Sequence, residues 1–191
     1  MDSVVLAGGQ GQRVGYQQKA LIDYEGQALL VRVLDVLKSQ VAQVWVNANA
    51  ELASYEDFSQ HVFSDQYQGY LGPLAGMQAA WQYCKKDWLL FVPCDNPHIA
   101  PDLLQRLIEA YQQQPNELVV AYDGKRIQPL YLLMHRNKLT ALTDALDKEH
   151  LSVKRWILEQ SHTEADFADV AEQVFQNLNS LEKVGKSLKG F

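Results

Sequence analysis

Five apolar residues in a row, Trp88-Leu89-Leu90-Phe91-Val92, restrict the possible fold of this chain more than any other segment. A strand with one face in water alternates apolar and polar residues, whereas a strand covered on both faces is apolar throughout. An unbroken run of this length therefore predicts a strand inside a parallel sheet, with helices packed on both sides. We expect an α/β protein.

Segments with strand and helix patterns alternate over the first 111 residues. In the helical segments apolar residues recur at spacings of three and four, as in Leu74, Met77 and Trp81, which places them on one helix face. Such alternation predicts right-handed crossovers and a mainly parallel sheet between two helix layers. Strands are expected at residues 4–7, 44–46, 61–63 and 88–92, and helices at residues 28–39, 74–84 and 101–111.

The second half of the chain has a different pattern. Two apolar runs flank the polar link Asp123-Gly124-Lys125-Arg126, and this arrangement predicts a hairpin. Ser152 is a suitable helix cap, and Asn179 with Glu182 has capping-box spacing for a last helix. Strands are expected at residues 118–122 and 130–134, and helices at residues 137–147, at 152–160 and from residue 179.

A glycine-rich loop follows the first predicted strand. Its glycines are Gly8, Gly9, Gly11 and Gly15. Glycines have no Cβ, so several backbone amides of such a loop can approach one anion. Arg13 can bind a phosphate through two parallel hydrogen bonds, and Lys19 adds a mobile positive charge. The loop is predicted to bind a polyphosphate; the alternative is an ordinary surface turn between a strand and a helix.

Two known phosphate motifs do not fit this loop. A Walker loop ends in Gly-Lys-Ser/Thr, and this sequence has no such ending. A dinucleotide-binding fingerprint that begins at Gly9 needs a third glycine where the chain has Val14. Both motifs are therefore excluded for this loop.

Polar residues follow the predicted strands at residues 8–19, 47, 65 and 95. In open α/β sheets ligands bind beyond the carboxyl ends of the strands. We therefore expect these four positions to converge on one edge of the sheet.

Asp95 follows the fully apolar strand and stands between two prolines. Magnesium prefers oxygen ligands, commonly one or two carboxylates together with substrate phosphates, so Asp95 is a candidate metal ligand. The alternative is a turn aspartate that caps the next helix. Asp65 could bind a base or a ribose, and Asn47 and Asn49 could contact a base edge, but all three also suit ordinary turns.

Composition excludes several function classes. The chain has 191 residues and a formal net charge of −6, which argues against a nucleic-acid surface because such surfaces are basic. The cysteines Cys84 and Cys94 have no metal-like spacing and suit a reducing compartment. The sequence has no secretory signal and no apolar run near the about 18 residues that span a bilayer. We expect a cytoplasmic protein that binds neither nucleic acid nor membrane.

A phosphate loop, two cations and one magnesium carboxylate describe phosphoryl or nucleotidyl transfer. The five histidines share no spacing, and no Ser-His-Asp or Cys-His arrangement is recognisable. A covalent nucleophile is not required, because positioning and charge neutralisation can provide most of the catalysis.

The segment from Leu6 to Gly15, followed by Lys19, resembles the signature of the nucleoside-triphosphate transferase superfamily. More narrowly, the chain is similar to the molybdenum cofactor guanylyltransferases. Four further segments agree with that family in type and order, from residue 4 to about residue 185. They are Val46-Asn47-Ala48-Asn49, Gly72-Pro73-Leu74-Ala75-Gly76-Met77, Pro93-Cys94-Asp95-x-Pro97 and Asn177-x-Asn179.

The resemblance implies a single domain over residues 1–191, a Rossmann-like three-layer α/β/α sandwich with a mixed, mostly parallel sheet. It also implies Mg²⁺-dependent transfer of GMP from GTP to molybdopterin, with release of pyrophosphate. GTP and molybdopterin are then the substrates, and proteins that deliver or accept the cofactor are further partners.

The resemblance assigns two groups of site residues. The catalytic residues are Arg13, Lys19 and Asp95. The nucleotide-binding residues are Leu6, Ala7, Gly8, Lys19, Asn47, Asp65 and Asp95. Among these, Lys19 contacts the phosphates, Asn47 and Asp65 contact the guanine and ribose, and Asp95 holds the metal. Asn179 matches an asparagine near the family's reaction centre, and either it or Asn177 could be a second metal contact.

The chain departs from the family in one segment. The family often has Gly-Gly-x-Asp-Lys there, whereas this chain has Gly15-Tyr16-Gln17-Gln18-Lys19, with Tyr16 in place of a glycine and the neutral Gln18 in place of an aspartate. Molybdopterin cytidylyltransferases are the second candidate family, and they typically have Leu-Ala-Ala-Gly where this chain has Leu6-Ala7-Gly8-Gly9. The glycine at position 8 favours guanine, because a missing methyl makes room near the larger base. A sugar-1-phosphate nucleotidyltransferase and a non-catalytic nucleotide sensor are two more distant candidates; the Asp95 segment favours an enzyme.

Overall fold

The computed structural model describes residues 1–9, 18–170 and 172–175. The strands are β1 (Asp2–Leu6), β2 (Asp23–Tyr24), β3 (Gln27–Ala28), β4 (Gln43–Asn47), β5 (Val62–Phe63), β6 (Trp88–Pro93), β7 (Leu118–Tyr122), β8 (Ile127–His135) and β9 (Thr163–Asp166). The α-helices are α1 (Leu29–Lys38), α2 (Leu52–Glu56), α3 (Pro73–Tyr83), α4 (Leu103–Gln113), α5 (Leu139–Asp147) and α6 (Val153–Leu158). Short 3-10 helices are η1 (Lys19–Leu21), η2 (Arg136–Lys138) and η3 (Glu172–Phe175).

One seven-stranded sheet runs through the molecule in the order β5-β4-β1-β6-β8-β7-β9, beside a small β2-β3 hairpin. β1 pairs in parallel with β4 and β6, and β4 pairs in parallel with β5. β8 runs antiparallel to both β6 and β7, whereas β9 is parallel to β7. The direction of β8 alone differs from the rest, so the mixed, mostly parallel sheet that the resemblance implied is confirmed.

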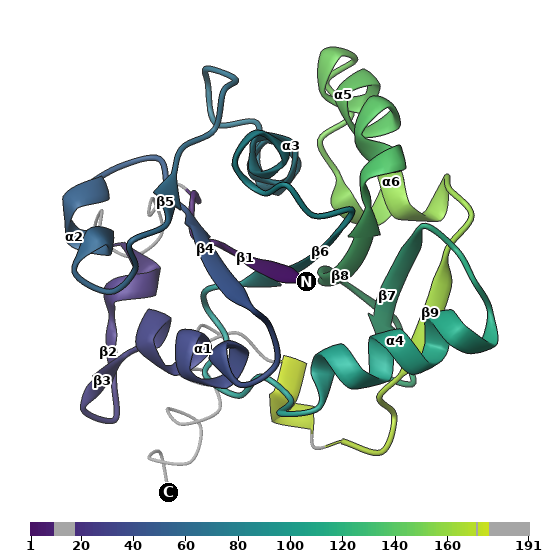
Figure 1. Ribbon diagram of the computed structural model, residues 1–191, viewed down its shortest axis with the longest axis horizontal. Coiled ribbons are helices and arrows are strands. Elements are labelled where there is room, and N and C mark those ends of the chain that lie inside the picture. Colours follow the sequence, from purple (N-terminus) through teal and green to yellow (C-terminus); the bar gives the residue numbers. More distant parts are fainter. Residues whose placement is uncertain (10–17, 171, 176–191) are drawn as a thin grey trace, which may run out of the picture.

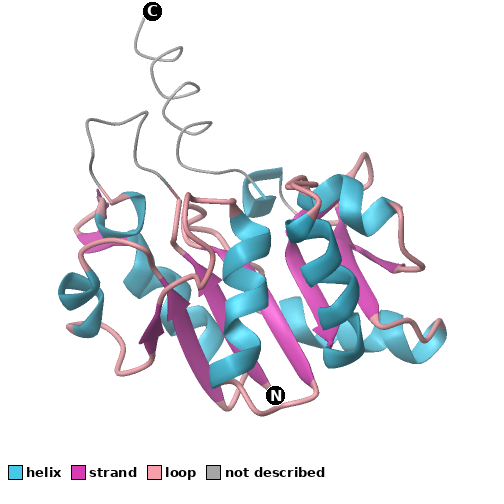
Figure 2. Ribbon diagram, turned by 90° about the horizontal axis from the view of Figure 1, so that it is seen from above, coloured by secondary structure: helices cyan, strands magenta, loops and turns pink. Residues whose placement is uncertain are grey.

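Helices cover both faces of the sheet. Figure 1 shows α3, α5 and α6 on one side of the strands and α1 and α4 on the other, and in Figure 2, seen from above, helices lie both in front of the strands and behind them. The three-layer α/β/α sandwich is therefore confirmed.

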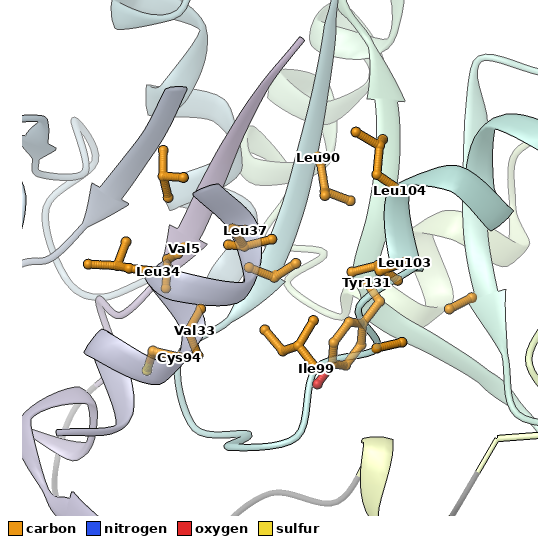
Figure 3. Packing of buried hydrophobic residues seen from close by; sticks show 14 of the residues in the cluster. Val5, Val33, Leu34, Leu37, Leu90, Cys94, Ile99, Leu103, Leu104 and Tyr131 are labelled. Atoms are coloured by element: carbon orange, nitrogen blue, oxygen red, sulfur yellow. The ribbon is translucent and has the colours of Figure 1, made fainter. Parts of the chain in front are cut away.

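The central strands divide their side chains between two cores. From β6, Leu90 and Val92 join the cluster under α1 and α4, whereas Leu89 and Phe91 join the cluster under α3, α5 and α6. All four side chains have no exposed surface. Figure 3 shows Val33, Leu34 and Leu37 of α1 gathered with Val5 and Leu90 in the first cluster. The unbroken apolar run thus indicates burial on both faces, as predicted.

Most of the predicted elements are present. The β7–β8 hairpin forms around the link at residues 123–126, and the Ser152 side chain caps α6 by accepting a hydrogen bond from the Arg155 amide at 3.3 Å. α4 begins at Leu103, two residues later than the predicted start at Pro101. The helix predicted from Asn179 lies outside the described residues.

Six short elements have no counterpart in the prediction: β2, β3, α2, β9 and the 3-10 helices η1 and η3. β9 alternates buried and exposed residues, which is an edge-strand pattern, but four residues are too few to distinguish it from a loop. Within the described ranges, no helix is long and apolar enough to cross a membrane.

Candidate active site

A pocket of about 180 Å³ opens at the carboxyl ends of β1, β4 and β6. Its lining includes the end of β1, the start of the glycine-rich loop, Lys19 and the Asp95 segment. The lining residues are Leu6, Ala7, Gly8, Gly9, Lys19, Asn47, Asp65, Gly72, Pro73, Pro93, Cys94, Asp95 and Leu130. The predicted convergence of residues 8–19, 47, 65 and 95 is confirmed for Gly8, Gly9, Lys19 and the last three positions.

A second groove, of about 510 Å³, lies between the segment after α1 and helix α4. Asp102 and Glu109 are among its lining residues, and no lysine or arginine is. An anionic phosphate ligand would be repelled there, so the pocket at the strand ends is the better site despite its smaller volume.

Asp65 is held by two asparagine side chains at the end of β4. The amide nitrogen of Asn47 donates to Asp65 Oδ1 at 2.8 Å, and that of Asn49 donates to Asp65 Oδ2 at 2.7 Å. The backbone amide of Asp65 returns a hydrogen bond to Asn49 Oδ1 at 2.9 Å. We call these three side chains the Asp65 clamp. Burial raises the pKa of the Asp65 carboxyl, and the two amide donors limit that rise.

Two glycines pack closely on the Asp65 clamp. A Cβ on Gly76, in the first turns of α3, would stand 2.3 Å from Asn47 Oδ1. A Cβ on Gly8 would stand 2.6 Å from Asn49 Nδ2 and 2.9 Å from Asn47 Oδ1. Real Cβ atoms do not approach so closely, so the clamp requires glycine at both positions. The glycine at position 8 is predicted to make room for the base, whereas in the structure the two amides fill that room.

The other side of the pocket carries the opposite charges Lys19 and Asp95. Burial raises the pKa of the Asp95 carboxyl, and the nearby positive charge of Lys19 partly offsets this effect. Lys19 opens the short helix η1, whose first turn is closed by a 2.9 Å hydrogen bond from the Leu21 amide to the Gln18 carbonyl. The Gln18 side chain accepts a 3.1 Å hydrogen bond from the buried Tyr55 hydroxyl. This contact anchors Gln18, one of the two positions at which the chain departs from the family pattern.

The Asp95 carboxylate suits a divalent cation. It is half-buried, so its negative charge is poorly solvated, and an added cation would relieve that cost. No group of three His, Cys, Asp or Glu side chains that could hold a metal is found in the part of the chain that the structure describes. Among the described residues, Asp95 would hold a metal here together with substrate oxygens, an arrangement typical of magnesium.

Cys94 does not provide a nucleophile. Burial raises the pKa of its thiol to about 12, with a further contribution from the Asp95 charge. The thiolate is the reactive form of cysteine, and almost none is present at neutral pH. This agrees with a reaction that needs no covalent intermediate.

A family model described as a MobA-like NTP transferase domain matches residues 3–164. The chain belongs to the MobA-like NTP transferase family. The match covers every described residue that lines the pocket, and membership makes the protein a nucleotidyltransferase.

Curated relatives within the MobA-like family are named molybdenum cofactor guanylyltransferases. The molybdenum cofactor guanylyltransferase of Shewanella frigidimarina is 40% identical over 183 residues, which cover 96% of this chain and 93% of that protein. The protein of the same name from Shewanella putrefaciens is 38% identical over 186 residues, with coverage of 96% and 93%. The resemblance stated from the sequence motifs is confirmed.

Solved structures support the MobA-like fold. Molybdopterin-guanine dinucleotide biosynthesis protein A from Archaeoglobus fulgidus superposes with a TM-score of 0.77 and 17% identity, over the full length of both chains. A Mycobacterium tuberculosis protein solved as a complex with manganese gives a TM-score of 0.69 and 15% identity, with 97% of this chain and 98% of that chain covered. At these identities the likeness concerns the fold.

Three predicted site residues, Arg13, Asn177 and Asn179, lie outside the described residues. The sequence predicts either a base-edge contact or a turn role for Asn49, and it does not predict that Asn49 holds Asp65 or that Gly76 packs on Asn47. The signal for both was the pairing of small and amide residues near strand ends. Their roles depend on side-chain packing between separate elements, which no local pattern encodes.

Proposed function

We propose that this enzyme transfers GMP from GTP to molybdopterin and releases pyrophosphate. The observation that carries the proposal is the composition of one pocket: a rigidly held carboxylate acceptor on one side, and Lys19 with Asp95 on the other. Close identity to molybdenum cofactor guanylyltransferases supports the choice of substrates.

Asp65 binds the nucleoside part of GTP. An ionised carboxylate is an acceptor only, and guanine and ribose both present N–H or O–H donors. Asn47 supports this contact mainly through Asp65, because its side chain is 2% exposed and its amide already donates to that carboxylate. Fixing the carboxylate in advance lowers the entropic cost of binding and disfavours bases without matching donors.

Lys19 binds the triphosphate, together with the backbone of Leu6, Ala7 and Gly8. We propose that Arg13 adds a second cation from the loop. A terminal phosphate oxygen of molybdopterin attacks the α-phosphorus of GTP, a new P–O bond forms, and the bond to the β-phosphate oxygen breaks. The leaving group is pyrophosphate, whose growing negative charge is stabilised by the positive charge of Lys19.

Asp95 is proposed to hold Mg²⁺. Bound there, the ion would supply charge neutralisation between two anionic reactants. The residue's contribution is a single carboxylate in a partly desolvated site, which would bind a hard cation and leave coordination positions for phosphate oxygens.

We also propose that residues 1–191 act as one domain in the cytoplasm, and that proteins delivering or accepting the cofactor dock near the pocket. The extent of the family match, residues 3–164, supports the single domain.

Pyrophosphate release from GTP, CTP and ATP, with and without molybdopterin, tests the function. The proposal expects release from GTP that depends on molybdopterin. Release from CTP in preference to GTP would indicate a cytidylyltransferase, and equal release from both would contradict the expected preference for GTP. Release that requires a sugar 1-phosphate in place of molybdopterin would indicate a sugar nucleotidyltransferase. GTP binding with no release under any condition would indicate a nucleotide sensor.

A further inference from the structure

The residue next to Asp95 connects three distant parts of the molecule. Asn96 is 1% exposed. Its amide nitrogen donates hydrogen bonds to the Tyr131 hydroxyl and to the Val174 carbonyl, and its Oδ1 accepts one from the His98 amide at 2.8 Å. Both donors and the acceptor of one buried side chain are therefore used.

The first partner, Tyr131, lies in an irregular part of β8. The β7–β8 register passes from Val120↔Leu132 to Ala121↔Gln128, so three β8 residues oppose none on β7. These are Pro129, Leu130 and Tyr131. Leu130 lines the pocket beside Asp95. Bulges near active sites typically redirect a side chain, and here the hydrogen bond from Asn96 fixes the bulge that presents Leu130.

The second partner belongs to the C-terminal segment. η3 carries Val174, and the ring of Phe175 packs edge-on against Tyr131 at 5.0 Å. Upstream, Arg106 Nη1 pairs with Asp169 Oδ1 at 2.6 Å. Asn96 therefore joins the Asp95 loop, the Leu130 wall and the segment that ends at Phe175.

We propose that Asn96 is a positioning residue for nucleotidyl transfer, which keeps the Asp95 loop, the Leu130 wall and the η3 segment in one fixed arrangement. The proposal rests on the proposed function. Asp95 is the proposed metal ligand, and the residue that follows it, Asn96, is buried and hydrogen-bonded to three other parts of the chain. A misplacement of about 1 Å can reduce a rate by roughly 100-fold, so an anchor next to the metal ligand has kinetic consequences beyond stability.

The chemistry at this position calls for an amide. Two acceptors, the Tyr131 hydroxyl and the Val174 carbonyl, and one donor, the His98 amide, face the same side chain. Asparagine offers two N–H donors and one carbonyl acceptor. Aspartate has the same shape but no donor, and it would add a second negative charge beside Asp95. Asn96→Asp therefore removes both donors and adds a negative charge, whereas Asn96→Ala removes the hydrogen bonds without adding a charge.

The test uses the full chain and two readouts. Binding of Mn²⁺ to the GTP complex is measured by electron paramagnetic resonance, and metal-dependent pyrophosphate release gives kcat and KM. We expect Asn96→Ala to weaken Mn²⁺ binding by roughly 10-fold and to lower kcat by roughly 100-fold. KM for GTP should stay within about threefold, because the Asp65 clamp is untouched. Tyr131→Phe should also weaken Mn²⁺ binding and lower kcat, but by smaller factors than Asn96→Ala.

Asn116→Ala is the matched control. Its amide donates a 2.9 Å hydrogen bond to the buried Thr163 hydroxyl, and neither residue lines the pocket. The control should lower the melting temperature without changing Mn²⁺ affinity. The proposal is overturned if folded Asn96→Ala keeps both constants within twofold of wild type, or if the control shifts them equally. Should the Asn96 variants not fold, unchanged constants in Tyr131→Phe overturn it. Wild-type protein without GTP-dependent release would refute the proposed function instead.

Discussion

Replacing Gly76 by alanine is predicted to damage GTP binding although residue 76 would never touch the nucleotide. The new Cβ would stand 2.3 Å from Asn47 Oδ1 and 2.8 Å from its Cγ. Ordinary contact begins near 3.4 Å, so the Asn47 amide has to retreat by about 1 Å. Its 2.8 Å hydrogen bond to Asp65 cannot survive that movement.

The magnitude follows from the kind of hydrogen bond that is lost. A hydrogen bond to a charged group contributes about 1.5–3 kcal/mol. If binding depends on the fixed Asp65 carboxylate, the affinity for GTP falls by roughly 10- to 150-fold. Global stability falls as well, because the same hydrogen bond stabilises the folded protein and overpacking costs about 1–3 kcal/mol; the better helix propensity of alanine, about 1 kcal/mol over glycine, offsets part of this loss.

The assay is a thermodynamic cycle with Asn47→Ala, measured by calorimetric titration of GTP. Asn47→Ala removes the oxygen that the new methyl would meet, so Gly76→Ala should cost little in that background. The coupling between the two changes should be about 2 kcal/mol, as is usual for residues in contact. Wild-type affinity in Gly76→Ala, or equal costs in both backgrounds, would refute the reasoning.

Three further predictions concern the charged groups and the metal. Lys19→Ala should lower kcat on the order of 100-fold while GTP binding weakens much less, as single-turnover and binding measurements would show; a rate within twofold of wild type would make Lys19 a surface residue. Asp95→Asn should raise the melting temperature of metal-free protein at neutral pH. Burial raises the folded-state pKa of this carboxyl, so the folded protein favours the protonated form. The contribution of this group to stability is therefore complete below its unfolded-state pKa and is lost as pH rises through its folded-state pKa. The difference from wild type should disappear in acid, and an unchanged melting temperature at pH 7 would contradict it. Removal of metal with a chelator should abolish turnover but leave GTP binding through Asp65 detectable by titration; undiminished turnover would exclude a metal role.

The sequence predicts the sheet well because its central strand has a strong local signal. Residues 88–92 are apolar throughout, and burial on both faces is the simplest environment that tolerates this. Convergence of Asp65 and Asp95 with Lys19 follows from topology alone, since parallel strands end at one edge. β9 is missed because its four residues carry too short a pattern.

The details of the site depend on contacts that a linear pattern does not contain. Gly76 supports Asn47 from a different element, and Asn96 reaches Val174 across 78 positions. Both contacts come from the exact packing of side chains after the fold has formed. Spacing therefore identifies the candidate charged groups of the pocket, whereas the residues that hold them become visible in three dimensions.

Transfer of label from the α-phosphate of GTP tests the central claim most directly. Wild-type protein with molybdopterin and Mg²⁺ should place the label in the molybdopterin product and release unlabelled pyrophosphate. Asp95→Asn should reduce this transfer by orders of magnitude at ordinary Mg²⁺, and excess Mg²⁺ or Mn²⁺ should recover part of it. Equal transfer from α-labelled CTP, or near-normal transfer by Asp95→Asn, would contradict the account.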